Sequence, residues 1–256
     1  MKPSRWFDRD AGCTGATLRL FCFPYAGAGA SSFRRLAQRL RRSVDVVRVR
    51  LPGREQRLAE RGYEDMDSLI EALLPELEPL VRGRCAFLGY SLGALVAFEA
   101  ARALQGGARP LERLLACACG APSTIHPVLG GNDDDDALLR RLRGLAATPP
   151  RLLEDRAAMS VLLPAIRADF RILDRYRFEP GPALRCTVHA LGGDRDTGVP
   201  LPELQAWRDH TTGCCDVSLL PGDHFFIHGS ADAFEQQVIR SLGIAEPCLA
   251  PAEQLI

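Results

Sequence analysis

Short apolar runs alternate with amphipathic stretches along most of this 256-residue chain. The apolar runs predict six strands buried on both faces of a sheet, at residues 17–23, 44–50, 84–88, 113–118, 186–191 and 215–219. The stretches between them repeat apolar residues at helical spacing and predict helices at residues 31–41, 66–81, 92–105, 202–210 and 231–242. Such alternation is typical of an α/β fold with a mostly parallel central sheet and helices on both faces.

The alternation breaks between about residues 122 and 178. This segment begins with a polar loop and an acidic run at residues 133–136, and its later leucine-rich stretches predict two to four amphipathic helices. The aspartates are best explained as a solvated loop before a helix N-terminus, where negative charge is favourable, and not as a metal site. We therefore expect a single domain over residues 1–256, with this helical insertion as a lid over a functional site.

Charge and cysteine content narrow the class of protein. The 32 basic and 32 acidic residues give a formal net charge of zero, which argues against nucleic acid or an anionic membrane as a partner. The nine cysteines are odd in number and lack metal-ligand spacing, so reduced thiols in a cytoplasmic protein are expected. The first residues lack the apolar core of a signal peptide, and no stretch is long enough for a membrane span.

Residues 89–93 read Gly-Tyr-Ser-Leu-Gly, between a predicted strand and a predicted helix. In that context the Gly-x-Ser-x-Gly pattern predicts a nucleophile elbow, a sharp turn that exposes the Ser91 hydroxyl at a helix N-terminus. Glycines two residues before and two after the serine leave room for the turn, because a Cβ there would collide with neighbouring backbone. Ser91 is therefore the predicted nucleophile.

A serine hydroxyl needs a base within hydrogen-bond reach, and the base needs an orienting carboxylate. In hydrolases with such an elbow, the order along the chain is serine, acid, histidine. His126 comes too early, His189 lies in a strand-like run, and His210 lies near the end of a helix-like run. His224 lies in a turn directly after the last predicted strand, at the sheet edge where the elbow also lies. We predict that His224 is the base, with His228 as a neighbour without a catalytic role.

The acid is expected after a strand that ends at the same edge. The predicted strand at residues 186–191 is followed by Gly-Gly-Asp-Arg-Asp, so Asp194 and Asp196 both qualify by position. The preceding strand is followed by residues 120–123, which contain no carboxylate. Asp223 adjoins the predicted base, so its side chain is expected to point away from the imidazole. These observations leave the choice between Asp194 and Asp196 open.

Two backbone amides are needed to hold the oxyanion of a tetrahedral intermediate. The residue after the nucleophile, Leu92, is expected to supply one of them. The other is expected from the small-residue loop at residues 23–30, in which Pro24 has no amide, so Tyr25 or Ala26 must donate. The glycines of this loop do not complete a phosphate-binding or dinucleotide-binding pattern.

Six sequence blocks carry a wider resemblance that extends from about Arg19 to Leu242. They are LFCFPYAGAGASSF (20–33), LPGRE (51–55), GYSLGA (89–94), LPAIRADF (163–170), GGDRD (192–196) and PGDHFF (221–226). Together they resemble the stand-alone type II thioesterases that accompany non-ribosomal peptide and polyketide synthases, a branch of the α/β-hydrolases. The LPGRE and PGDHFF blocks are more specific than the elbow.

The resemblance implies roles that the residues alone do not decide. The second aspartate of the GGDRD block becomes the acid, which is Asp196, and the second oxyanion donor becomes Ala26. A proline often follows the acid in this family, whereas this chain has Thr197. The implied activity is hydrolysis of acyl groups from the phosphopantetheine arm of acyl or peptidyl carrier proteins, for editing or release. No metal or organic cofactor is implied, and we expect a monomer.

Two other functions remain open at this point. A general carboxylesterase or an acyltransferase could use the same three residues. A non-catalytic carrier-binding protein is a different class, which the complete set of serine, acid and histidine disfavours. The acyl-chain preference and the partner synthase do not follow from the sequence.

Overall fold

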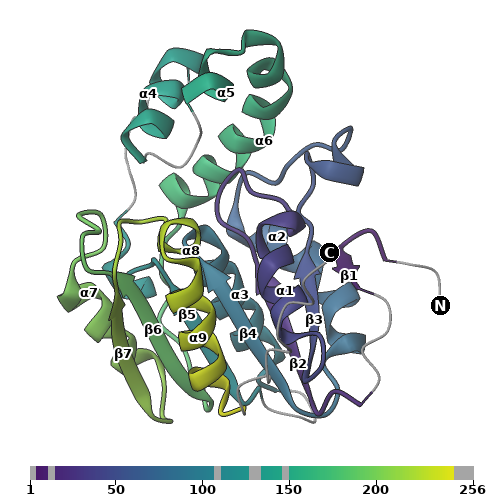
Figure 1. Ribbon diagram of the computed structural model, residues 1–256, viewed down its shortest axis with the longest axis vertical. Helices are drawn as coiled ribbons and strands as arrows, with labels where there is room; N and C mark the ends of the chain where they lie inside the picture. Colours follow the sequence, from purple (N-terminus) through teal and green to yellow (C-terminus); the bar gives the residue numbers. More distant parts are fainter. Residues whose placement is uncertain (1–3, 11–14, 107–110, 127–133, 146–149, 245–256) are drawn as a thin grey trace, which may run out of the picture.

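The computed structural model describes residues 4–10, 15–106, 111–126, 134–145 and 150–244. Its centre is a seven-stranded sheet in the order β1-β3-β2-β4-β5-β6-β7 (Figure 1). All neighbouring strands pair in parallel except β1, which pairs antiparallel with β3. The α/β fold with a mostly parallel sheet, predicted from the apolar runs, is confirmed.

Six strands fall on the predicted segments, with ends that differ by one or two residues. They are β2 (Leu18–Phe23), β3 (Val44–Val49), β4 (Cys85–Tyr90), β5 (Arg113–Cys117), β6 (Thr187–Gly193) and β7 (Cys215–Leu220). Strand β1 (Phe7–Arg9) was not predicted, because three residues at a sheet edge are too few to show a periodic pattern.

Helices cover both faces of the sheet (Figure 1). On one face, α2 (Met66–Leu77) and α3 (Leu92–Leu104) pack on a core that includes Phe21, Phe87 and Trp207. On the other face, α1 (Arg34–Leu40) and α9 (Ala231–Leu242) enclose a core that includes Leu20, Leu88 and Phe234. Successive side chains of each central strand therefore enter different cores, which explains why these strands read as continuous apolar runs.

Three predicted helices are shorter or divided. The segment predicted at 31–41 begins as a 3-10 turn, η1 (Ala30–Phe33), before α1. The segment predicted at 66–81 ends as an α-helix at Leu77 and continues as η3 (Glu78–Leu80), where Pro79 has no amide for the helical ladder. The segment predicted at 202–210 consists of α7 (Leu201–Gln205) and η5 (Ala206–His210).

The helical insertion lies between β5 and β6, beyond the carboxyl edge of the sheet (Figure 1). After a short 3-10 turn, η4 (Pro122–Thr124), it contains α4 (Asp135–Leu145), α5 (Pro150–Glu154) and α6 (Arg156–Arg175). The acidic run leads into α4, and the Asp134 carboxylate accepts the Ala137 amide at 2.6 Å, as a helix cap does. Asp133 lies outside the described residues. Leu142, Leu163 and Phe170 belong to a separate apolar cluster that holds the three helices together.

Two remaining observations concern membranes and metals. None of the described helices combines the length and apolar character needed to cross a membrane. Within the described ranges, no group of three or more His, Cys, Asp or Glu side chains is arranged to hold a metal ion.

Candidate active site

Ser91 lies in a tight turn between β4 and α3. Its backbone angle φ is positive, at 51°, and its ψ is −117°. Its amide donates a 2.8 Å hydrogen bond to the Cys117 carbonyl of the neighbouring strand, which fixes the turn against the sheet. A Cβ on Gly89 would lie 2.2 Å from the Gly93 carbonyl oxygen, and a Cβ on Gly93 would lie 2.1 Å from the Phe23 carbonyl oxygen. Both positions therefore require glycine, as the elbow pattern predicts.

His224 and Asp196 reach Ser91 from loops at the same edge of the sheet. The His224 Nε2 atom lies 3.1 Å from Ser91 Oγ, and its Nδ1 atom lies 2.8 Å from Asp196 Oδ2. Tyr90, directly before the serine, donates its hydroxyl to the His224 carbonyl at 2.7 Å. An ionised Asp196 accepts only, so Nδ1 carries the proton and Nε2 is left to accept from the Ser91 hydroxyl. This arrangement can activate a hydroxyl for attack on a carbonyl carbon.

The surroundings of Asp196 favour its ionised form. Burial by itself would raise the pKa of this carboxyl group, but its hydrogen bond with His224, the charge of His224 and the backbone amides of Gly198 and Val199 outweigh burial. The pKa of Asp196 therefore lies below its ordinary value. The Gly198 amide donates to Asp196 Oδ1 at 2.9 Å, leaving Oδ2 for the imidazole.

Asp194 and Asp223 do not reach the imidazole. Asp194 accepts the Gly222 amide at 2.8 Å, so it holds the turn that carries His224. Asp223 accepts the Phe225 amide at 2.8 Å within its own turn. Of the two aspartates that the residues left open, the structure brings Asp196 to His224 and gives Asp194 a turn-forming contact.

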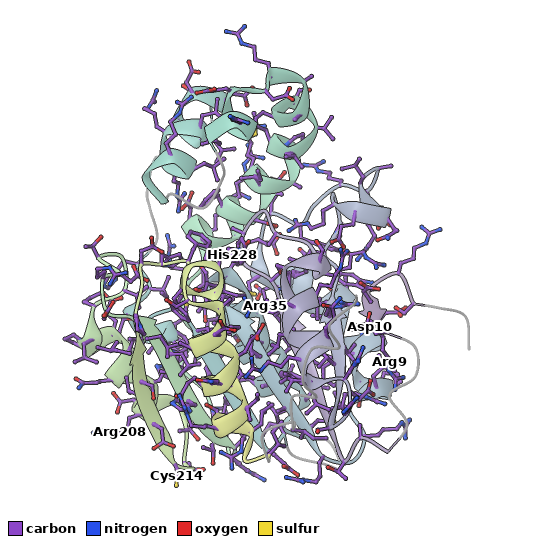
Figure 2. The ribbon with its side chains drawn as sticks, viewed as in Figure 1. Arg9, Asp10, Arg35, Arg208, Cys214 and His228 are labelled. Atoms are coloured by element: carbon purple, nitrogen blue, oxygen red, sulfur yellow. The ribbon has the colours of Figure 1, made fainter. Side chains whose placement is uncertain are left out.

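The other described histidines make contacts away from Ser91. His189 lies between the hydroxyls of Ser218 and Ser241, at 2.9 and 2.7 Å. His210 is buried and lies 2.8 Å from the Ser123 hydroxyl. His228 lies in α8 (Phe226–Gly229), beneath the helical insertion (Figure 2), and its Nε2 atom lies 2.7 Å from the Tyr25 hydroxyl. His228 thus supports the loop that carries Tyr25 and makes no contact with the serine.

The loop between β2 and η1, residues 24–29, forms a turn beside the elbow. The Ala28 amide donates to the Tyr25 carbonyl at 2.9 Å, and Gly27 has φ +79°, which fits the third position of a type II turn. Among the described residues, none accepts a hydrogen bond from the Ala26 amide or the Leu92 amide. Both predicted donors are therefore available to a ligand.

A cavity of about 470 Å³ joins these groups to the helical insertion. Its lining includes Ser91, Asp196 and His224, together with Ala26 and Gly27 of the loop. The insertion contributes Arg141 and Gly144 of α4 and six apolar side chains: Leu142, Met159, Leu162, Ile166, Phe170 and Leu173. A larger hollow of about 1020 Å³ lies beside α2 and α3, but it contains none of the three reactive side chains. The smaller cavity is therefore the candidate binding site.

Sequence reasoning gave no individual role to several residues that shape this site. Arg54 and Glu55 lie in the LPGRE block, and Asp169 lies in the LPAIRADF block. Arg54 and Asp169 contact the β2–η1 loop, and Glu55 contacts the start of η1 directly after it. The available signal was the presence of charged residues inside blocks that are otherwise apolar or glycine-rich. That signal shows that a partner is needed, but it does not say which segment supplies the partner.

A parallel sheet with a serine at a strand–helix elbow, a histidine after the last strand and a helical insertion defines an α/β-hydrolase. The family model described as "Thioesterase domain" matches residues 18–243, and the chain belongs to this family. It is a serine hydrolase that acts on thioesters, and the resemblance to type II thioesterases is confirmed.

Similar proteins include a biosynthesis protein and two thioesterases. The chain is 36% identical over 235 residues to the gramicidin S biosynthesis protein GrsT of Aneurinibacillus migulanus, covering 89% of this chain and 90% of that protein. It is 39% identical over 226 residues to thioesterase PikA5 of Streptomyces venezuelae, covering 87% and 80%. The solved structure of the type II thioesterase BorB, from the borrelidin biosynthetic cluster, has 34% sequence identity and a TM-score of 0.85, covering 96% of this chain and all of BorB.

Proposed function

We propose that this thioesterase hydrolyses acyl groups from the phosphopantetheine arm of carrier proteins in polyketide or non-ribosomal peptide biosynthesis. Such hydrolysis would edit stalled or mis-primed chains or release intermediates. The observation that carries the proposal is the hydrogen-bonded series Ser91–His224–Asp196 at the floor of an apolar cavity. The biosynthetic roles in the names of GrsT and BorB support the substrate class, and the name of PikA5 supports the thioesterase activity.

In this proposal Ser91 is the nucleophile, His224 the base and Asp196 the orienting acid. His224 takes the hydroxyl proton as Ser91 Oγ attacks the thioester carbonyl carbon, and a tetrahedral intermediate forms. Its collapse breaks the carbon–sulfur bond, and the protonated imidazole supplies the proton to the leaving phosphopantetheine thiolate. His224 then removes a proton from water as the water oxygen attacks the acyl–serine ester. When this second tetrahedral intermediate collapses, the bond between the acyl carbon and Ser91 Oγ breaks, the imidazolium returns its proton to Oγ, and the free acid is released.

We further propose that the Leu92 and Ala26 amides hold the oxyanion in both steps. Leu92 is the first residue of α3, where backbone amides have no partner within the helix and the helix dipole favours negative charge. The open amide of Ala26 lies in a turn of small residues that lines the same cavity. Two preorganised donors of this kind stabilise the transition state more than the ground state.

The proposal also includes the partner of the enzyme, its oligomeric state and its cellular compartment. The partner is an acyl or peptidyl carrier protein, and the enzyme acts as a monomeric single domain in the cytoplasm, with the helical insertion as its lid. Free thiols at the seven cysteines of the described residues are compatible with a reducing compartment. The apolar lining that the insertion contributes favours an acyl chain over a polar substituent.

A panel of acyl-carrier thioesters and matched oxygen esters tests the proposal. We expect kcat/KM to be at least tenfold higher for a carrier-bound thioester than for the oxygen ester with the same acyl group. An equal or higher value for the free oxygen ester would favour a general carboxylesterase. Transfer of the acyl group to an added alcohol in preference to water would instead favour an acyltransferase.

A further inference from the structure

A buried ion pair connects the helical insertion to the loop that carries Ala26. Asp169 lies on α6, and Arg54 lies in the loop after β3; their side chains are 3% and 5% exposed. The guanidinium binds both carboxylate oxygens, at 2.7 Å to Oδ2 and 2.8 Å to Oδ1. This two-pronged contact fixes the relative orientation of two segments that are 115 residues apart in the sequence.

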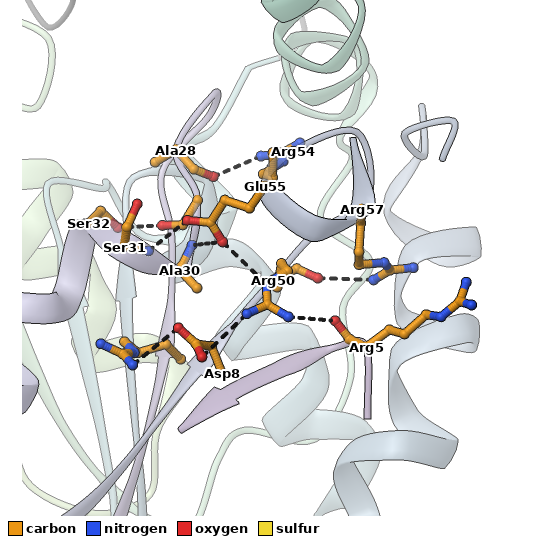
Figure 3. Close-up of polar contacts among 12 residues, drawn as sticks. Arg5, Asp8, Ala28, Ala30, Ser31, Ser32, Arg50, Arg54, Glu55 and Arg57 are labelled. Carbon is orange, nitrogen blue, oxygen red and sulfur yellow. Dashed lines mark hydrogen bonds and ion pairs between the residues drawn. The ribbon is translucent and has the colours of Figure 1, made fainter. Parts of the chain in front are cut away.

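The same two side chains also bind the backbone of the β2–η1 loop. Asp169 Oδ2 accepts the Gly27 amide at 2.7 Å. Arg54 donates to the Ala28 carbonyl at 3.0 Å (Figure 3) and also donates to the Pro52 carbonyl at 3.1 Å. The ion pair thus holds the two residues that directly follow Ala26, one through its amide and the other through its carbonyl.

Close packing against α6 reinforces these hydrogen bonds. A Cβ on Gly27 would lie 3.0 Å from the Ile166 side chain, and a Cβ on Gly53 would lie 2.8 Å from the Ala165 Cβ. Both glycines have a positive φ, at +79° and +81°. The β2–η1 loop and the Arg54 loop therefore both rest on the same turn of α6, with no space for adjustment.

Glu55 holds the other end of the β2–η1 loop. Its carboxylate accepts the Ser31 amide at 2.9 Å and the Ala30 amide at 3.2 Å, and Arg50 donates to it at 3.2 Å (Figure 3). Arg50 in turn contacts Asp8 on strand β1 at 3.3 Å. The downstream end of the loop is thus fixed to the sheet, whereas its turn at residues 25–28 is fixed to the insertion.

We propose that Arg54 and Asp169 are positioning residues that hold the Ala26 amide in register for the oxyanion, so that α6 of the helical insertion sets the geometry of the oxyanion hole. The inference rests on the proposed function through the donor role of Ala26. Neither side chain touches the substrate; each acts through the backbone of Gly27 and Ala28. Displacement of α6 would carry the turn with it and weaken stabilisation of the transition state.

Positioning explains the burial of this pair better than stability does. Removing two charges from water costs several kcal/mol per ion, and apolar residues of similar volume often replace a buried pair without loss of stability. What apolar residues cannot replace is an acceptor for the Gly27 amide and a donor for the Ala28 carbonyl. Loss of one oxyanion donor in a hydrolase lowers kcat by about 10² to 10³.

The test uses two double variants in the full-length protein. Arg54→Met with Asp169→Leu removes both charges and the acceptor for Gly27, and we expect kcat to fall about 10²-fold with KM within about threefold of wild type. Arg54→Met with Asp169→Asn also removes both charges, but the amide oxygen can still accept from Gly27. We expect the kcat of this second variant to be at least tenfold higher than that of the variant with Asp169→Leu. Melting temperatures check that both variants are folded.

Arg57→Gln with Glu60→Gln is the matched control. Arg57 is buried and ends the 3-10 turn η2 (Glu55–Arg57), which directly follows Arg54. Its side chain binds Glu60 at 2.7 Å, and its other hydrogen bond goes to the Arg50 carbonyl and not to residues 25–30. Wild-type kcat is expected for this control. If the variant with Asp169→Leu does not fold, Arg54→Lys decides. The lysine ammonium lacks the planar fork by which the guanidinium binds both Asp169 oxygens and the Ala28 carbonyl, so kcat should fall about tenfold.

Wild-type kcat in the leucine variant or in Arg54→Lys would overturn the inference. It would also be overturned if the control lost as much kcat as the leucine variant, since that would indicate a general structural role. Each protein is assayed on an acyl-carrier thioester and on a small oxygen ester. A wild-type enzyme that cleaves the ester but not the thioester contradicts the proposed function, whereas equal ester turnover by wild type and the leucine variant contradicts the positioning role.

Discussion

At the scale of single residues, the elbow could be predicted because its pattern has a direct steric cause. Gly89 and Gly93 are the positions where a Cβ would meet backbone at 2.2 and 2.1 Å. No comparable steric constraint distinguishes Asp194 from Asp196 in the sequence. Both follow the same strand two residues apart, and which carboxylate meets His224 depends on how the loop folds back on itself.

Asp196→Asn and Asp194→Asn separate the two roles experimentally. Asparagine at 196 places an amide beside Nδ1 and favours the wrong imidazole tautomer, so we expect kcat to fall about 10⁴-fold. Asparagine at 194 can still accept the Gly222 amide, so the loss should stay below about tenfold. Steady-state kinetics on one thioester substrate measure both.

The two variants serve as controls for each other, because each removes one carboxylate from the same loop. A larger loss of kcat for Asp194→Asn than for Asp196→Asn would contradict the assignment of the acid. Melting temperatures within a few degrees of wild type would show that the kinetic differences do not come from unfolding.

At the scale of elements, the central strands were predictable because both of their faces are buried. The ends of the strands were harder to predict. Strands β4 and β6 extend to Tyr90 and Gly193 through glycine-containing segments that are equally typical of turns. The contact of Asp169 with Arg54 was beyond prediction for a different reason. A charged residue in an amphipathic helix normally lies on the solvated face, so the sequence gives no sign that Asp169 is buried or that its partner lies 115 residues away.

Gly93→Ala tests whether the start of α3 must approach the end of β2 closely. The new Cβ would press on the Phe23 carbonyl oxygen, one residue before the β2–η1 loop. We expect a destabilisation of about 1–3 kcal/mol. We also expect lower kcat, because the two proposed oxyanion donors would move apart. Urea unfolding and thioester turnover measure the two effects.

Gly106→Ala is the control for this substitution. Its Cβ would meet no atom within 4 Å, and Gly106 follows the end of α3, outside the lining of the cavity, so stability and turnover should both stay close to wild type. If Gly93→Ala were as stable and active as wild type, close contact between elbow and loop would not be needed for the site.

At the scale of the whole molecule, the sheet and the helical insertion contribute different parts of one site. The carboxyl edge of the sheet carries Ser91, Asp196 and His224, whereas the insertion supplies the apolar side of the cavity. The Arg54–Asp169 pair connects the two parts through the β2–η1 loop. A substrate that moved the insertion would therefore act on both the proposed acyl-binding surface and the proposed oxyanion hole.

The insertion and its place in the fold were predictable from the break in strand–helix alternation, but the cavity was not. Leucine-rich helices indicate only that an apolar face is buried, and each leucine could equally pack within the insertion. Leu163 does so, whereas Leu142 and Met159 both pack in the insertion and line the cavity. The division follows from the crossing of three helices, which periodicity does not specify.

The most direct test of the central claim is the rate at which Ser91→Ala hydrolyses an acyl-carrier thioester. If Ser91, His224 and Asp196 act as a unit, turnover should fall about 10⁶-fold from wild type, and His224→Ala should lose a similar factor. Intact-protein mass should also show an acyl adduct on the wild-type enzyme during turnover and none on Ser91→Ala. Hydrolysis by Ser91→Ala at a rate close to wild type would contradict the account.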